Sequence, residues 1–364
     1  MKFKIIDRYI MGKYIGTFLF ASLIFSLIII VVDISQKVEK FVSEDLTLNQ
    51  IIFDYYVYFV PHINIMLWPL FALVSVIFFT SRLASNSEII SILNAGVSFK
   101  RVMIPYILTA ILLIIVHLMA NHTWVPQASK HRLKFENTYI SKGKKQYDKS
   151  NNIHLFTDEN TKIFVRYFRE QDSTISDLRL ERFEDLDLVY MLKAKRVTWQ
   201  PETKKWRVSD YLIHTFDGLN ETLTKVNDQP FDTVLNMVPK DFIRFTNEKE
   251  MMTSAEIRQQ IESERLRGLS NTRIFEVEIY RRYADAYTLL ILTLMGLAIA
   301  SRKVRGGMGL HLATGISIGA GYIVFSKFAL TFAQGNVIPP AIGVWIPNII
   351  FTVITIYLLS KAQK

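Results

Sequence analysis

The sequence contains many residues that can act in catalysis, but none of them stands in the spacing that a catalytic motif requires. There is no cysteine, which excludes thiolate metal sites and a cysteine nucleophile. There is no Gly-x-Ser-x-Gly elbow and no His-Glu-x-x-His pair. The run Gly306-Gly307-Met308-Gly309 lacks the Lys-Ser/Thr pair of a nucleotide-binding loop. We therefore predict no catalytic residues, no cofactor and no metal, so that the energy for any work comes from a partner or an ion.

Histidines are the remaining candidates for chemistry within the apolar stretches. A lone histidine in such a place usually packs against a neighbouring helix, and a ligand or proton-relay role is the less frequent alternative. Four of the seven histidines lie in or near these stretches, namely His62, His117, His122 and His311.

The segment 82–101 carries the strongest local signal for a functional contact. Its spacing predicts a short helix over about 83–96, because Ser85 or Asn86 can cap the start and Gly96 is placed to end it. Glu88 is the single acid of the segment. The helix has an apolar face formed by Ile89, Ile92 and Leu93.

Spacing alone leaves two interpretations of this helix open. One is a helix that lies on the membrane surface with its polar side in water. The other is a coupling helix that docks in a groove of a cytoplasmic ATPase, with Glu88 bound to a basic partner.

Lysines that could contact a lipid follow the first long apolar stretch. Lys37 and Lys40 stand there beside Asp33 and Glu39. Such lysines either bind the phosphates of an anionic lipid or extend their ammonium groups to the interface as anchors. Lys327 lies within an otherwise apolar stretch, where it extends to the interface or lines a polar vestibule.

The composition identifies the elements that position these residues as membrane spans. Of the 364 residues, 50% are hydrophobic and 21% are charged, which is less charge than a typical soluble protein carries. The charges gather in 130–282, with 28 basic and 25 acidic residues. We predict an integral membrane protein with one aqueous insert, and we exclude a soluble globule and a disordered chain.

Several uncharged stretches are long enough to cross about 30 Å of hydrocarbon. We expect six spans, with a loop at Gln334–Pro340 before the sixth. The first five cover Tyr14–Val32, Tyr55–Ser81, Val102–Ser129, Ala286–Ser301 and Gly306–Ser326.

Charge in the short loops predicts the orientation. The segments 1–13, 82–101, 302–305 and 361–364 hold 12 basic and two acidic residues, whereas 33–54 holds two lysines and five acids. We therefore expect both termini in the cytoplasm, and we attribute the net charge of +10 to this asymmetry rather than to nucleic-acid binding. The first segment is expected to form an amphipathic interfacial helix.

The polar insert alternates apolar and polar residues over several short runs, which turn residues separate. This period of two predicts antiparallel strands in a sandwich or jelly roll. Near its end, Thr253 and Glu256 form a capping box for a charged helix. The domain is either a structural cap or a dock for an amphiphilic ligand. The runs cover 162–168, 175–183, 186–199 and 206–216.

These patterns divide the chain into three parts. Residues 1–129 form an N-terminal membrane half with spans one to three, 130–270 form the insert, and 271–364 form a C-terminal half with spans four to six. The expected fold class is an α-helical membrane protein with six transmembrane helices and an inserted periplasmic all-β, jellyroll-like domain.

Seven short motifs stand in a specific order along nearly the whole chain: Asp7-Arg8-Tyr9-Ile10, Arg82…Ser87-Glu88…Ala95-Gly96-Val97-Ser98…Arg101…Pro105, Trp124-Val125-Pro126, Lys205-Trp206-Arg207, Arg282-Tyr283-Ala284-Asp285-Ala286, Arg305-Gly306-Gly307, and Pro339-Pro340…Trp345-Ile346-Pro347-Asn348. In this order they resemble the lipopolysaccharide-export permeases LptF and LptG. The opening motif and Val31-Val32-Asp33 lean toward the LptG type.

This resemblance implies a permease subunit of an ATP-driven exporter in the bacterial inner membrane. Such an exporter extracts lipopolysaccharide from the outer leaflet and passes it to a periplasmic bridge. The implied partners are a dimer of an LptB-like cytoplasmic ATPase, a homologous LptF-like six-span permease and an LptC-like single-span protein. Spans one and five of the two permeases would line the lipid cavity.

The resemblance also implies roles for particular residues. Contact with lipid phosphates falls on Lys37 and Lys40, to which we add Lys327 as a vestibule residue. One departure is Ile30, which stands where the LptG type can carry a basic residue facing these phosphates. The ATPase-coupling role falls on the segment with Arg82, Glu88, Ile89, Leu93 and Gly96.

Two other classes of function stay open. One is a membrane receptor or scaffold with a periplasmic sensing domain, which needs neither an ATPase nor a partner permease. The other is an ion-driven lipid flippase, which should carry acids buried within its spans. The predicted spans hold almost no acids, and Asp54 and Asp285 lie at span ends.

Overall fold

The computed structural model describes most of the chain. The described residues are 4–140, 147–148, 151–158, 160–169, 171–185, 187–218, 220–226, 229–235, 237–242, 244–245, 248–266, 272–301, 307–335 and 337–362. Of the glycine-rich run Gly306–Gly309, where a tight turn is expected, Gly306 lies outside them, and α9 begins at Gly307.

The chain forms two compact units. The helical unit comprises Met1–Lys142, Glu250–Ser254 and Ile274–Lys364, and the β unit comprises Gly143–Lys249 and Ala255–Arg273. The exact domain boundaries expected after residues 129 and 270 stay a prediction.

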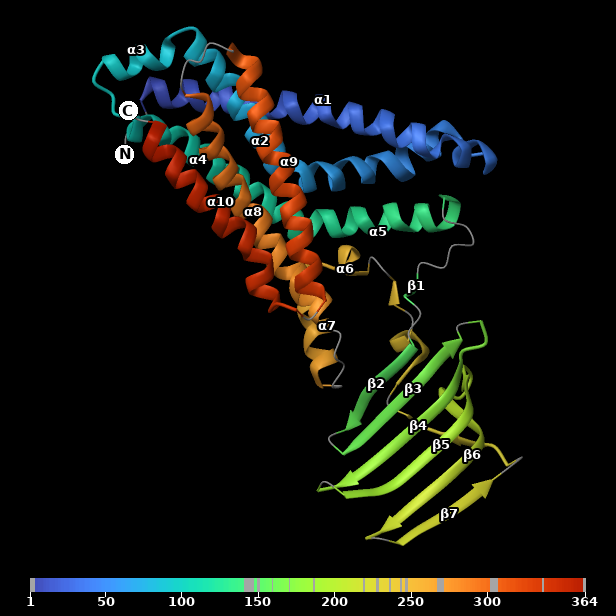
Figure 1. Cartoon of the computed structure of the whole chain (residues 1–364). Coiled ribbons are helices and arrows are strands. Elements are labelled where there is room, and N and C mark those ends of the chain that lie inside the picture. The colour runs from blue at the N-terminus through green and yellow to red at the C-terminus, as the bar shows by residue number, and fades with distance from the viewer. Residues whose placement is uncertain are drawn as a thin grey trace. The chain divides into compact units, whose positions relative to one another are not determined.

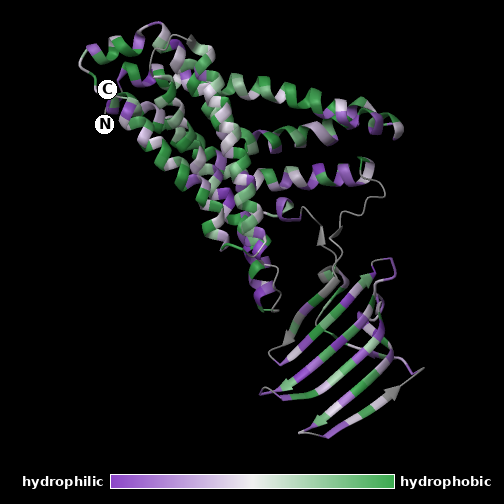
Figure 2. Cartoon of the chain, viewed as in Figure 1, coloured by the Kyte–Doolittle hydropathy of each residue, from purple (hydrophilic) through white to green (hydrophobic). Residues whose placement is uncertain are grey.

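Among the described residues, six helical segments are long and apolar enough to cross a membrane, which confirms the predicted number of spans. Figure 1 shows their arrangement, and Figure 2 shows mainly hydrophobic residues along them. The loop expected before the last span separates the fifth and sixth segments. In order they are α1 (Ile5–Ser43), η1 (Gln50–Tyr56) with α2 (Val57–Ser85), α4 (Phe99–Met119) with η2 (Ala120–Trp124), α5 (Val125–Phe135) and η3 (Glu136–Ile140), α8 (Arg273–Ala300), α9 (Gly307–Gln334) and α10 (Pro340–Ala362).

The first span is longer than predicted. α1 has 39 residues, which is about 58 Å of helix and nearly twice the hydrocarbon thickness. The apolar run ends at Val32, but the helix continues because Asp33 and Lys37, one turn apart, pair on its surface. α1 also begins at Ile5 without a break, so the expected interfacial helix is the first part of α1 rather than a separate element.

The start of α1, the end of α10 and α3 (Glu88–Asn94) lie at one end of the helical unit (Figure 1). The largest apolar cluster joins them, since Ile10, Ile89 and Val102 are buried in it and Leu359 packs against it. α1 packs on α2 and α4, and α9 packs on α2 and α10. Three segments that the charge pattern assigns to the cytoplasm are therefore neighbours in space.

A buried asparagine links the last three helices. The amide nitrogen of Asn348 in α10 donates to the carbonyl of Ala284 at 3.0 Å. Its amide oxygen accepts from the hydroxyls of Thr288 in α8 and Tyr322 in α9, each at 2.9 Å. An unpaired polar group costs free energy in an apolar interior, so this network fixes the three helices to one another.

A proline in α2 creates an acceptor that a histidine of α4 fills. Pro69 has no N–H, so the carbonyl of Ile65 loses its ordinary helical partner. Nε2 of the buried His117 lies 3.2 Å from this oxygen and can donate to it. His117 thus has the helix-packing role that is expected for a lone histidine in a span.

Two glycines let α9 approach α2 closely. A Cβ on Gly319 would lie 2.7 Å from Cδ1 of Leu70, and a Cβ on Gly315 would overlap Cδ1 of Ile77. Small residues at a spacing of four are a common means of close helix packing in membranes. Gly321, on the same helix, has no atom within 4 Å of an added Cβ.

The β unit is built around one antiparallel sheet, in which β2 to β7 follow in chain order and β8 pairs with β6. The prediction of an all-β insert is confirmed, and the four predicted runs are β3 to β6. Among the described strands the connectivity is that of a meander, which is simpler than the crossed connections of a jelly roll. The strands are β2 (Asn151–Asp158), β3 (Thr161–Arg169), β4 (Thr174–Glu184), β5 (Asp187–Gln200), β6 (Lys205–Asp217), β7 (Asn220–Val226) and β8 (Phe231–Thr233), and β1 (Tyr147–Asp148) pairs with β9 (Arg244–Phe245).

The Lys205-Trp206-Arg207 motif holds the returning chain on this sheet. The indole N–H of the fully buried Trp206 donates to the carbonyl of Met237 at 2.9 Å. Arg207 donates twice to Asp232 of β8, at 2.8 and 3.1 Å, and these bonds lower the pKa of that carboxyl. Two short elements, η4 (Pro239–Phe242) and α6 (Glu248–Met251), precede α7 (Ser254–Leu266), which begins where the capping box predicts.

The glycine contacts predict a difference between two faces of α9. Gly315→Leu should lower the free energy of unfolding by about 1–3 kcal/mol, because the added side chain overpacks against α2. Gly321→Leu, which meets no neighbour, should not lower it, because leucine has a higher helix propensity than glycine by roughly 0.5–1 kcal/mol. Thermal unfolding of both variants in the same detergent checks this. Equal effects would show that α9 does not pack on α2 through Gly315.

Candidate functional site

The short helix predicted over about 83–96 is present as α3, but it is shorter than expected. α2 continues through Ser85, and the N–H of Asn86 still donates to the carbonyl of Arg82 at 3.0 Å. Neither Ser85 nor Asn86 therefore caps α3. The N-cap is Ser87, whose φ of 61° lies in the left-handed region. The chain needs this unusual conformation because it reverses direction between two helices within a few residues.

The end of α3 is as predicted. Gly96 has a φ of 84°, a conformation that glycine adopts at little cost. Its N–H donates to the carbonyl of Leu93 at 3.0 Å, and the N–H of Val97 donates to that of Ile92 at 3.4 Å. These two bonds form a Schellman motif and satisfy carbonyls that the helix end leaves open.

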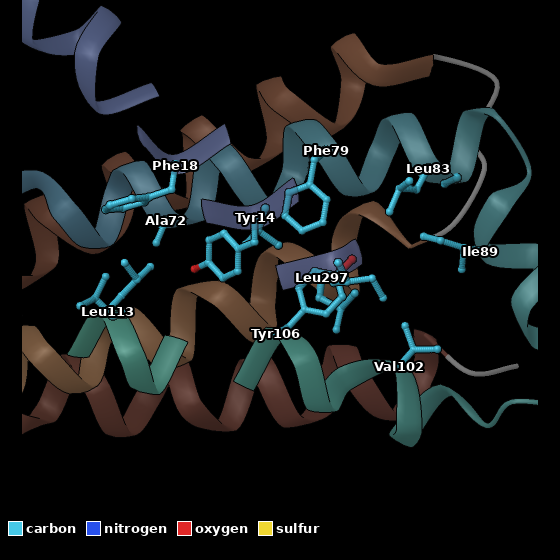
Figure 3. Packing of buried hydrophobic residues seen from close by; sticks show 14 of the residues in the cluster. Tyr14, Phe18, Ala72, Phe79, Leu83, Ile89, Val102, Tyr106, Leu113 and Leu297 are labelled. Carbon is cyan, nitrogen blue, oxygen red and sulfur yellow. The ribbon is translucent and has the colours of Figure 1, made fainter. Parts of the chain in front are cut away.

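The apolar face of α3 points into the helical unit rather than outward. Ile89 is 2% exposed and lies beside Leu83 of α2 and Val102 of α4 (Figure 3). Ile92 and Leu93 pack against the same cluster. Burial of these side chains fixes α3 on α1, α2 and α4, so they position the helix.

A partner would meet a different surface of α3. Ile90 is 42% exposed, and Ser91, Asn94 and Arg82 are also exposed. The coupling role predicted for Ile89 and Leu93 stays a prediction, and the exposed surface of α3 is one isoleucine with polar neighbours. Helical periodicity gives the faces of α3, but it does not say which face the rest of the protein covers.

Glu88 lies in the first turn of α3 and is half-buried. Its Oε2 accepts a hydrogen bond from the hydroxyl of Tyr9 in α1 at 3.0 Å. Its Oε1 accepts from the side-chain amide of Asn86 at 3.3 Å. The two bonds hold the carboxylate in one orientation at the surface of the unit.

A second polar contact joins α1 to the segment 82–101, which we call the coupling segment after its predicted role. Asp7 is 2% exposed, and its two oxygens accept from the two terminal nitrogens of Arg101, each at 2.6 Å. Oδ2 of Asp7 also accepts from the backbone N–H of Lys4 at 2.9 Å, which closes the first turn of α1. Arg101 lies in the first turn of α4, where Ser98 caps the helix.

The C-terminal end of α1, which the charge pattern predicts to be its outer end, carries a group of charged and tyrosine side chains that we call the outer charged cluster. Nζ of Lys37 lies 2.7 Å from Asp33 and 3.2 Å from Glu136 of η3, and it also bonds to the hydroxyl of Tyr55. The Lys37 side chain is only 18% exposed. The cluster comprises Asp33, Lys37, Tyr55, Tyr56, Arg132, Glu136 and Glu250.

Arg132 extends this cluster to the chain that returns from the insert. Its two terminal nitrogens donate to Glu136 at 3.0 Å and to Glu250 of α6 at 3.1 Å. Both carboxylates lie where the chain leaves or rejoins the helical unit. The cluster therefore holds α1, α5 and α6 together.

Two adjacent tyrosines of the π-helical η1 complete the cluster. The hydroxyls of Tyr56 and Tyr55 lie 3.0 and 3.4 Å from the carboxylate of Asp33. Their rings pack with Phe41, Phe59 and other apolar side chains around the charges. Sequence reasoning did not assign a role to these tyrosines, and the only available signal was an aromatic pair opposite the charged end of α1.

The three lysines predicted to bind lipid differ in their surroundings. Lys37 is held by carboxylates, whereas Lys40 and Lys327 are exposed. Ile30, which replaces a basic residue of the LptG type, packs against the apolar side chains around the cluster. The structure brings Lys37 and Lys40 to the outer end of α1 and places Lys327 on α9.

α1 and α9 leave the most apolar surface uncovered. In the most apolar part of each helix, only 11% of the residues of α1 and 22% of those of α9 are buried. These are the two lowest values among the six segments. Exposed apolar surfaces of this size mark contacts with lipid or with another protein.

A buried charge group in α8 holds the returning segment. Arg282 is 1% exposed and donates to Glu278 at 3.1 Å, to the hydroxyl of Ser254 at 2.8 Å and to the carbonyl of Met252 at 2.8 Å. Its neighbour Arg281 bonds to the same Glu278 at 2.8 Å. Sequence analysis singled out the Arg282 motif but gave it no role, because its partners are distant in the sequence.

Six apolar helical segments, an inserted β unit and a set of paired buried charges define a polytopic membrane protein with a large inserted domain. The family described as lipopolysaccharide export system permease LptF/LptG matches residues 8–361. The chain belongs to this family.

Its similar relatives carry LptG names. The lipopolysaccharide export system permease protein LptG of Escherichia coli K12 is 21% identical over 363 residues, which cover 97% of this chain and 98% of the relative. That of Haemophilus influenzae is 21% identical over 298 residues, which cover 81% and 82%. The resemblance to the LptG type is thereby confirmed.

The outer charged cluster predicts unequal effects of two lysine substitutions. Lys37→Ala should lower the free energy of unfolding by about 1–3 kcal/mol, because Asp33 and Glu136 lose their shared cation in a poorly solvated site. Lys40→Ala, one turn away and exposed, should change it by less than about 0.5 kcal/mol. Thermal unfolding in detergent measures both. A stability loss that is as large for Lys40→Ala would contradict a structural role specific to Lys37.

Proposed function

We propose that this chain is the LptG-like permease subunit of an ATP-driven lipopolysaccharide exporter in the bacterial inner membrane. An LptB-like ATPase dimer supplies the energy, a homologous LptF-like permease completes the lipid cavity, and an LptC-like single-span protein joins them. The complex extracts lipopolysaccharide from the outer leaflet and passes it to a periplasmic bridge.

The observation that carries this proposal is the position of α3 at one end of a helix with an open apolar face. α3 presents Glu88 and Ile90 where the charge pattern puts the cytoplasm. α1 starts beside α3 and exposes most of its apolar length. An ATPase bound at α3 can therefore act on the helix that contacts the lipid.

The transport step follows from differential binding in two states. With the cavity open, acyl chains lie on the uncovered faces of α1 and α9. Closure of the two permeases, driven by ATP hydrolysis in the partner, removes this surface and forces the lipid outward. The β unit, whose sheet packs around the buried Ile163, Leu180 and Leu192, is the proposed receiver of the lipid.

The three lysines differ in when they can contact the lipid head group. Lys40 and Lys327 are exposed and can meet a phosphate directly. Lys37 must first leave Asp33 and Glu136, whose carboxylates would otherwise repel the phosphate. Lys37 therefore contributes to lipid binding only when the outer charged cluster opens.

The pairing of buried acids argues against an ion-driven flippase. In the described part of the helical unit, Asp7, Asp33 and Glu278 are buried acids, and each pairs with an arginine or lysine. A carboxylate that carries a proton across the membrane has to give up such a partner in every cycle. The Asp7–Arg101 pair instead joins α1 to α4, and the other two pairs lie within α1 and within α8.

Glu88 gives a direct test of coupling. Glu88→Ala should strongly reduce lipid release per ATP hydrolysed, because the ATPase loses its charged contact, while thermal unfolding stays nearly unchanged. The exposed Glu39 at the other end of α1 is the matched control, and Glu39→Ala should keep both properties. Unchanged lipid export by Glu88→Ala would count against α3 as the coupling helix.

The partners are tested by purification from native membranes in mild detergent. We expect the tagged chain to bring a cytoplasmic ATPase, a second six-span permease and lipopolysaccharide in stoichiometric amounts, identified by mass spectrometry. Recovery of the chain alone, without ATPase or glycolipid, would favour a receptor or scaffold function.

A further inference from the structure

Two polar contacts join the first turns of α1 to the coupling segment. Tyr9 donates to Glu88 across 79 positions of sequence, and Arg101 forms a bidentate pair with Asp7 across 94 positions. One contact lies at the start of α3 and the other lies just after its end. The beginning of α1 is therefore bonded to residues at both ends of the segment that contains α3.

The two contacts differ in strength and exposure. The Asp7–Arg101 pair has two charge-assisted bonds of 2.6 Å to a carboxylate that is 2% exposed, so it resists salt and fixes orientation. The Tyr9–Glu88 contact is a single bond of 3.0 Å at the surface. The first is suited to anchor α1, and the second is suited to orient the Glu88 carboxylate.

α1 is also the longest helix that the structure describes at this end of the unit. It is one helix of 39 residues without a proline. By contrast, α2 contains Pro61 and Pro69, and α4 contains Pro105, each of which interrupts the helical hydrogen bonds. A displacement of the first turn of α1 is therefore carried along its whole length.

We propose that Asp7 and Tyr9 are positioning residues that attach α1 to the coupling segment, so that a movement imposed on α3 by an ATPase moves α1 directly. This inference rests on the proposed function and adds the route by which the cytoplasmic event reaches the lipid-facing helix. Tyr9 acts through Glu88, and Asp7 acts through Arg101.

Tyr14 offers a control for a merely structural role of these contacts. It lies on the same helix, and its buried hydroxyl shares a 2.6 Å hydrogen bond with Thr293 of α8. Tyr14→Phe removes a hydroxyl from α1 as Tyr9→Phe does, but it touches no residue of the coupling segment. If the hydroxyl of Tyr9 only stabilised the docking of α1, the two variants would behave alike.

The test uses the complete exporter in lipid vesicles and measures ATP hydrolysis and lipid release together. Tyr9→Phe and Asp7→Asn should each lower the lipid released per ATP by about fivefold or more, while ATP hydrolysis continues. Tyr14→Phe should lower thermal stability and leave the lipid released per ATP unchanged. Combining Asp7→Arg with Arg101→Asp should restore part of the coupling that either charge reversal removes.

The distance between α1 and α9 reports the proposed movement of α1 without a measurement of lipid transport. Because the chain has no cysteine, spin labels can be placed at Leu23→Cys on α1 and Val324→Cys on α9, both at exposed positions. ATP should change this distance in the otherwise unaltered complex, and Asp7→Asn should reduce the change. An undiminished change in Asp7→Asn would overturn the inference.

The outcomes separate the two proposals. Suppose that the unaltered complex releases lipid when it hydrolyses ATP, and that Tyr9→Phe and Asp7→Asn release as much lipid per ATP as Tyr14→Phe. This result would overturn the inference and leave the proposed function intact. Absence of ATP-driven release from the unaltered complex, with its partner ATPase bound, would overturn both.

Discussion

A polar group inside an apolar bundle has no water to bind, so it must find its partner within the protein. In the helical unit this requirement determines which helices lie together. Asp7 binds Arg101 of α4, Lys37 binds Glu136 of η3, and Asn348 binds Thr288 of α8. Apolar packing alone gives little preference among helices in lipid, because lipid tails are as apolar as leucine. The polar pairs therefore select the arrangement, and the apolar side chains fill it.

The same requirement explains why α1 links the two ends of the unit. Its first turns are tied to α3 and α4 by Tyr9 and Asp7, and its far end is tied to η1 and η3 by Asp33 and Lys37. Between these ties the helix keeps an open apolar face. A helix that is held at both ends and uncovered in the middle can move as a rod against lipid or a partner, which is what the proposed transport cycle needs.

The type of a side chain did not predict whether it is exposed to a ligand or a partner. Lys37 and Lys40 lie one turn apart on the same helix, yet one is enclosed by two carboxylates and the other is exposed. In α3, Ile89 and Ile90 are neighbours in sequence, but one is buried in the bundle and the other is open to a partner. In both cases the difference comes from the elements that pack around the residue and not from the residue itself.

Features that depend on neighbouring residues could be predicted from the amino-acid sequence. Hydropathy gave six spans, alternation gave β3 to β6, and Gly96 gave the end of α3, because each rests on a local period or a single backbone conformation. The length of α1, the buried face of α3 and the partners of Glu88 and Lys37 instead depend on tertiary contacts. Those partners come from as far as 79 and 99 positions away, and no local pattern encodes which distant side chain will satisfy a buried or half-buried charge.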